Sequence, residues 1–130
     1  RQASYHRIAV EGCGLRALRN WVFILQQDGA RRVMQTLPGS TVADPLLQQD
    51  ALRAARMSAQ ASAPGCQQIV AVTGDFDGPD AEPGVPRRTR PWTETWIMNA
   101  CGTRYSVPML FTPTATGTSF TARQAARLPG

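Results

Sequence analysis

The 130-residue sequence contains no lysine, one histidine and three cysteines, and it lacks any long apolar run. Its fourteen basic residues are all arginine, a bias more typical of a whole genome's composition than of a selected surface. The longest strongly apolar run, Trp21–Leu25, is far shorter than the roughly 20 residues of a membrane helix. We therefore expect a protein that does not span a membrane.

The scarcity of histidine restricts catalysis. A Ser-His-Asp or Cys-His arrangement would have to recruit His6, near the amino end, and no phosphate-binding or nucleophile-elbow pattern is present. Glu94 is expected on a strand, whereas Asp75 and Asp77 flank a loop, so no rigid pair of acids is indicated. We expect no enzyme, no catalytic residue and no cofactor.

The three cysteines, Cys13, Cys66 and Cys101, include no C-x-x-C pair. With a single histidine, this spacing disfavours a zinc site or a redox dithiol. One disulfide and one odd thiol is the natural count for an exported protein. A periplasmic or secreted location is expected, with any signal peptide removed or lying outside this sequence.

The net charge of +5 comes from arginines scattered along the chain, most densely in the segment 87–90. Scattered charge does not form the continuous basic stripe of a nucleic-acid-binding protein. Nucleic acid is therefore disfavoured as a partner.

One helix is predicted near residues 45–62. Asp44 is a good N-cap, Pro45 suits the first helical turn, and Pro64-Gly65 ends a run of strong helix formers. Its apolar stripe consists of small residues, including Ala51 and Ala54, so the helix is expected to lie close against a sheet.

Strands are predicted after the helix. They cover residues 66–76 and 92–98, then 105–111, where apolar residues alternate at period two, and finally 118–122. The tail 123–130 is expected to be loose.

The first forty residues are ambiguous, because Leu15, Leu18, Val22 and Leu25 also fit a helical face. An internal comparison favours strands. A shift of 88 residues places Cys13-Gly14 on Cys101-Gly102, Arg16 on Arg104, Phe23 on Phe111 and Gly29 on Gly117. We therefore predict strands near Tyr5–Gly12, Arg19–Gln26 and Ala30–Thr36.

These elements predict a single α+β domain over residues 1–130, mainly antiparallel β-sheet. It would contain two β units, related by duplication, with the helix near 45–62 packed on the sheet.

The disulfide can be predicted from strand register. If the strands 66–76 and 92–100 pair with Cys66 opposite Cys101, then Asp77 lies opposite Arg90 and a turn is centred on Pro83-Gly84. This register favours Cys66–Cys101, and Cys13–Cys101 is the alternative, because Cys13 and Cys101 are equivalent in the repeat.

The loop 77–91 is expected to be flexible, with acids followed by arginines. Its carboxylates allow a calcium site as a minor alternative, although their order does not match an EF-hand. The residues of this alternative are Asp75, Asp77, Asp80 and Glu82.

Trp92 and Trp96 fall on one face of their strand, with Glu94 between them. We expect this pair to pack in the core, the usual place for such aromatics. The alternative is a partially exposed platform for a partner, bordered by Arg104 and Tyr105 and extended by the loop arginines Arg87 and Arg88.

The carboxyl half, with Trp92-x-Glu94-x-Trp96, Cys101-Gly102 and the strand ending Phe111-x-Pro113, resembles small uncharacterised exported proteins of proteobacteria. This resemblance covers residues 66–122. It implies an envelope location and transfers no activity.

The leading hypothesis is a non-catalytic extracytoplasmic domain of the bacterial envelope that binds another protein or takes part in an assembly. Oligomerisation could use a free sheet edge or Cys13. The alternatives are an inhibitor or immunity-type protein that uses the loop 75–90, and a small hydrolase or ligand carrier.

Overall fold

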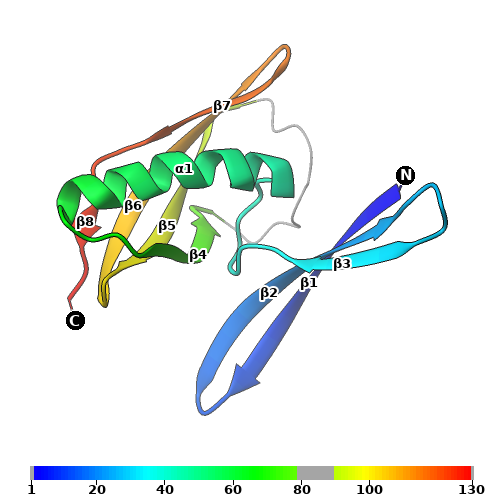
Figure 1. Ribbon diagram of the computed structural model, residues 1–130, viewed down its shortest axis with the longest axis horizontal. Helices are drawn as coiled ribbons and strands as arrows, with labels where there is room; N and C mark the ends of the chain where they lie inside the picture. The colour runs from blue at the N-terminus through cyan, green and yellow to red at the C-terminus, as the bar shows by residue number, and fades with distance from the viewer. Residues whose placement is uncertain (1, 79–89, 130) are drawn as a thin grey trace.

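The computed structural model describes residues 2–78 and 90–129, and it contains two antiparallel sheets and one helix (Figure 1). A helix-covered sheet forms the larger body, and a narrower three-stranded sheet extends away from it (Figure 1). The predicted α+β class, mainly antiparallel with one helix packed on a sheet, is confirmed.

The amino-terminal sheet, called sheet A below, has the order β1-β2-β3. Its strands are β1 (Gln2–Gly12), β2 (Leu15–Leu25) and β3 (Arg31–Gln35). The β1–β2 hairpin is paired along its whole length, from Gln2 opposite Leu25 to Gly12 opposite Leu15. The first forty residues are therefore strands, as the internal repeat indicated, and β2 begins four residues earlier than predicted.

The second sheet, sheet B, has five strands in the order β4-β5-β6-β7, with β8 beside β6. The bounds of these strands are β4 (Ile69–Phe76), β5 (Trp92–Ala100), β6 (Thr103–Thr114), β7 (Gly117–Ala122) and β8 (Ala126–Arg127). Helix α1 (Pro45–Ser62) lies across β4 to β7. Among the residues that the structure describes, no helix is long and apolar enough to cross a membrane.

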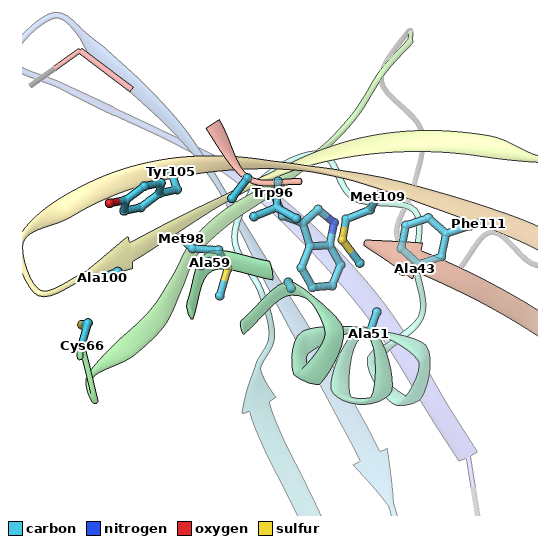
Figure 2. Close-up of a cluster of buried hydrophobic side chains, with 13 residues drawn as sticks. Ala43, Ala51, Ala59, Cys66, Trp96, Met98, Ala100, Tyr105, Met109 and Phe111 are labelled. Atoms are coloured by element: carbon cyan, nitrogen blue, oxygen red, sulfur yellow. The ribbon is translucent and has the colours of Figure 1, made fainter. Parts of the chain in front are cut away.

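The helix begins and ends as its sequence predicts. Asp44 caps it by accepting a hydrogen bond from the backbone N–H of Leu47 at 2.8 Å, and Pro45 occupies the first turn. The residues Ala51, Ala55 and Ala59 are fully buried, and they bring the helix axis close to the sheet. Figure 2 shows Ala51 and Ala59 facing the large side chains of Trp96, Met98 and Met109 from β5 and β6.

A buried segment, residues 36–44, joins the two sheets, and we call it the strap. Its backbone bonds to β2 on one side, where Gly39 N–H donates to Leu18 O at 3.0 Å. On the other side Thr41 N–H donates to the carbonyl of Gly74 in β4 at 2.9 Å. Gly39 has φ +107°, and a Cβ there would lie 2.4 Å from the Gly74 oxygen, so only glycine fits this crossing.

Both Cys-Gly turns adopt the same conformation, with φ +53° and +74° at Cys13-Gly14 and +52° and +88° at Cys101-Gly102. Each closes a two-residue hairpin, and positive φ at both central residues is the form that matches strand twist. A third strand follows each hairpin, β3 in sheet A and β7 in sheet B. The two β units therefore share one strand order, as the repeat predicted.

The predicted disulfide Cys66–Cys101 is confirmed, with Cα atoms 5.9 Å apart. The register that led to it is wrong. Ile69 lies opposite Ala100, and the pairing shifts once more between Ala71 and Thr73, an irregularity of the β-bulge type. Cys66 therefore precedes β4 and is not a strand residue.

The same register shift changes the pairing beyond the carboxyl end of β4. Asp77 does not lie opposite Arg90 as predicted, because its backbone N–H donates to Thr93 O at 3.1 Å.

The carboxyl-terminal segment is attached where a loose tail was expected. Arg123 N–H donates to Pro108 O and Leu128 N–H to Arg104 O, both at 2.9 Å. Ala125 is buried, and the hydroxyl of Ser62 in α1 donates to its carbonyl. Contacts with both the helix and β6 order this segment. Most of the predicted flexible loop 77–91 lies outside the described residues.

Removing the disulfide should destabilise the domain. The double variant Cys66→Ala/Cys101→Ala frees a loop of sequence separation 35, and the loop-entropy argument gives a loss of about 4 kcal/mol in unfolding free energy. Urea denaturation measures the loss, and Cys13→Ala, at an exposed position, should change stability by less than about 0.5 kcal/mol. A peptide map of the oxidised protein that joins Cys13 to another cysteine would contradict this assignment.

Candidate functional site

One face of sheet A is apolar and faces solvent, and we call it the open face. Side chains directly opposite in paired strands share a face, and they alternate along each strand. From the observed registers, the open face consists of Ser4, His6, Ile8, Val10, Ala17, Arg19, Trp21, Phe23, Leu25, Arg31, Val33 and Gln35.

Most apolar residues of the open face are exposed, whereas Ala17 and Trp21 are half-buried. Ile8 is 52% exposed, Val10 50%, Phe23 42% and Val33 57%. Large exposed apolar patches are uncommon on monomers and are typical of interaction surfaces in general. The face is formed by β-branched and aromatic residues, which favour strands whether or not anything covers them.

The face also has polar features that orient a contact. The ring of His6 lies 4.7 Å from that of Phe23, centroid to centroid, and its Nε2 is 3.2 Å from Ser4 Oγ. Near the β2–β3 end, a hollow of about 750 Å³ is lined by Phe23, Val33, Arg31 and their neighbours. The hollow combines apolar walls with a guanidinium group, so it suits a partially apolar, anionic ligand.

Positive charge is concentrated in this part of the chain. Residues 1–36 contain six arginines and two acidic residues, a net charge of +4, whereas residues 37–130 contain eight arginines and seven acids. Two of the six, Arg19 and Arg31, lie on the open face itself. The electrostatic attraction of sheet A is therefore for an acidic partner.

The opposite face of sheet A attaches it to the strap. Asn20, which is 1% exposed, donates its side-chain N–H groups to the carbonyls of Leu37 and Gly39 at 2.7 and 2.9 Å. Arg7 donates to Asn20 Oδ1 at 2.7 Å and to Thr41 O at 2.5 Å. This polar network fixes which face of sheet A is turned toward the strap and which is left open.

The strap is held in turn by the fully buried carboxylate of Glu94 in β5. Its Oε1 accepts from the hydroxyl of Thr41 at 2.5 Å, and its Oε2 from the N–H of Val42 at 3.0 Å. The indole N–H of Trp96 donates to Oε1 at 2.9 Å, and the indole N–H of Trp92 donates to Oε2 at 3.0 Å. Four donors, two at each oxygen, satisfy an ionised carboxylate, which only accepts.

A second carboxylate holds the strap at β4. Asp75 Oδ1 accepts from the backbone N–H and from the hydroxyl of Ser40, at 2.9 and 3.2 Å. The hydroxyl of Ser40 also accepts from the backbone N–H of Phe76 at 3.1 Å, and the residue is only 7% exposed. The Ser40 hydroxyl therefore links the strap to β4 by donating one hydrogen bond and accepting another. Its position does not resemble that of a catalytic nucleophile.

The residues predicted as an aromatic platform do not form one. Trp96 is fully buried and Tyr105 is 8% exposed, because both face α1, and Trp92 stacks on Phe111 with centroids 5.0 Å apart. The preferred expectation, that the tryptophan pair packs in the core, agrees with these positions. Arg104 is exposed, on the other face of the strand from Tyr105. Arg87 and Arg88 lie outside the described residues.

Of the four residues proposed as a calcium site, only two lie in the described part of the chain. Asp75 binds the strap, and Asp77 Oδ1 accepts from the hydroxyl of Thr95 at 3.0 Å. Asp80 and Glu82 lie outside the described residues, and within the described part no three potential ligands gather around one point.

The third cysteine, Cys13, is exposed at the tip of the β1–β2 hairpin. The β1–β2 hairpin that carries it extends away from the helix-covered sheet (Figure 1).

Sequence reasoning missed the open face. The signal was partial: Ile8 and Val10 alternate with polar or small residues in β1, but in β2 every residue of the run Trp21–Leu25 is apolar. Such alternation predicts one apolar face and does not say whether that face is covered.

No protein-family model, curated protein or solved structure matches the chain.

Glu94 should be essential for joining the strap to sheet B. In Glu94→Gln the amide N–H₂ replaces an acceptor and faces two donors, so we expect a loss of about 2–4 kcal/mol in unfolding free energy. Chemical denaturation followed by tryptophan fluorescence measures it. Thr93→Gln, at the neighbouring exposed position, should change stability by less than about 0.5 kcal/mol. Equal stability of the Glu94→Gln variant and the wild type would refute the role.

Proposed function

We propose that this chain is a non-catalytic, extracytoplasmic protein-binding domain of the bacterial envelope, and that it binds an acidic protein partner on the open face of sheet A. The observation that carries the proposal is the exposure of Phe23 and Val33, which lie directly opposite each other on β2 and β3, and of Ile8, which lies on the same face of β1 opposite Arg19. Burial of this apolar surface would provide the binding free energy, at roughly 25 cal/mol per Å² before the costs of association.

The charge distribution supports an acidic partner. Apolar contact at the centre with arginines around it is a common composition of protein interfaces, in which arginine and aromatic residues are enriched. Arg19 and Arg31 would lie at the rim, where charges mainly raise the association rate and select the partner. The net charge of +4 on residues 1–36 argues against two copies meeting through this face.

The envelope location is supported by chemistry. Disulfides persist in oxidising compartments, and Cys66–Cys101 joins the segment before β4 to the β5–β6 turn in sheet B.

The inhibitor and carrier alternatives have less support. The loop 75–90 lies mostly outside the described residues, and only its first positions are placed. A carrier would need a pocket beside Trp92 and Trp96, but these side chains are packed against the core and bonded to Glu94.

Removing apolar surface from the open face should abolish partner capture. The double variant Ile8→Thr/Val33→Thr keeps the β-branched shape that strands favour and replaces an ethyl group at position 8 and a methyl group at position 33 with a hydroxyl, both at exposed positions. We expect its affinity for the partner to fall at least about tenfold, measured by calorimetry with a partner first captured from an envelope extract of the source organism.

The matched control is Val70→Thr, on β4 of sheet B, where the side chain is 56% exposed and lies outside the open face. It should bind as the wild type does, and both variants should keep the wild-type melting temperature within a few degrees. Undiminished binding by the Ile8→Thr/Val33→Thr variant would count against the proposal. Loss of capture after nuclease treatment would do the same, because it would identify the ligand as nucleic acid.

A further inference from the structure

The internal repeat identifies the face of sheet B that corresponds to the open face. The shift of 88 residues that superposes the two Cys-Gly turns also superposes β1 on β5 and β2 on β6 with the same pairing. The third strands, β3 and β7, differ by one residue in register, because Phe23 lies opposite Val33 whereas Phe111 lies opposite Phe120. Under this shift Ile8 corresponds to Trp96 and Val10 to Met98. Both counterparts are fully buried.

The correspondence continues along the second strand of each unit. Trp21 corresponds to Met109 and Phe23 to Phe111, and these counterparts are 1% and 0% exposed. In sheet B this face is covered by α1 through the small residues Ala51, Ala55 and Ala59 (Figure 2). The open face is thus the equivalent of a helix-binding face, with no helix on it in the described structure.

From this equivalence, and resting on the proposed function, we propose that the partner presents an amphipathic helix that packs across the open face. The helix would carry a stripe of small apolar residues at i, i+4 and i+8, as α1 does, because small residues let a helix approach a sheet closely. Acidic residues would flank the stripe, facing Arg19 and Arg31.

The dimensions agree with this occupant. The strands β1 and β2 have 11 residues each, which corresponds to about 36 Å of hairpin. A helix as long as α1, with 18 residues, spans about 27 Å and fits within that length.

A peptide copied from α1 tests the proposal without knowledge of the natural partner. The probe is residues 44–63 with a helix-stabilising cross-link between positions 46 and 50, both exposed in the domain. A second probe adds Arg53→Glu and Arg56→Glu on the outward side; because the cross-link replaces Asp50, the side-chain net charge changes from +1 in the first probe to −3 in the second. A third carries Ala51→Gln, Ala55→Gln and Ala59→Gln, which leaves the charge unchanged and removes the small-residue stripe.

We expect the acidic probe to bind the intact domain about tenfold more tightly than the basic probe at low salt, with the difference narrowing at high salt. Fluorescence anisotropy of labelled peptides gives these affinities. The Gln probe should bind the domain at least about tenfold more weakly than the first probe, which has the same charge. The acidic probe should bind the Ile8→Thr/Val33→Thr variant at least about tenfold more weakly than it binds the wild-type domain. Amide NMR shifts should map to the open face and not to the α1 side of sheet B.

Three results would overturn the inference. The first is no binding of either Ala-stripe probe up to about 1 mM. The second is binding that the Ile8→Thr/Val33→Thr variant leaves unchanged, or shifts that map to sheet B, where a probe would replace α1 itself. The third is a concentration-dependent dimer in sedimentation that buries the open face against a second copy.

The peptide test and the partner-capture test can refute the helical occupant and the protein-binding function independently of each other. If partner capture depends on Ile8 and Val33 while the probes do not bind, the protein-binding function stands and the helical occupant is wrong. If the probes bind but capture does not depend on these residues, the face accepts a helix and the proposed function fails.

Discussion

The buried carboxylate of Glu94 is the interaction on which the arrangement of the two sheets depends. A carboxylate removed from water is tolerated only when donors replace its hydration, and here Thr41, Val42 and two indole groups do so. Because two of those donors belong to the strap, Glu94 fixes the strap on sheet B. The strap in turn carries the carbonyls that bind Asn20, so the orientation of sheet A follows from a bond made in β5.

The repeat explains why one unit is covered and the other is open. Both units present an alternating apolar face on a hairpin closed by a Cys-Gly turn, but the chain supplies a single described helix, and that helix packs on sheet B. The strand pairing of sheet A is complete along its first hairpin, since β1 and β2 are paired over eleven positions. What it lacks is burial of one face, which is the main favourable term in folding and in association. A partner on that face would therefore gain the same kind of contact that α1 makes within the domain.

Much of the fold could be predicted from residues close together in sequence. Asp44-Pro45 and Pro64-Gly65 bound the helix through local capping and backbone preferences, and period-two alternation identified the strands. The register of β4 against β5 could not be predicted, because an irregularity of the β-bulge type near Val72 shifts the pairing and periodicity alone does not reveal it. The disulfide was nevertheless predicted correctly, since a shift of two residues at the start of a strand still leaves Cys66 near the β5–β6 turn.

The sequence by itself determined the kinds of elements, their turns, the cysteine pair and the presence of an apolar face on each hairpin, because these follow from local preferences and periodicity. Only the tertiary structure decided which of the two faces is buried and what Glu94 binds. Those outcomes depend on contacts between residues more than fifty positions apart, such as Thr41 with Glu94. A pattern of alternation is identical for a covered strand and an open one, so the surface that we propose as the binding site became visible only in three dimensions.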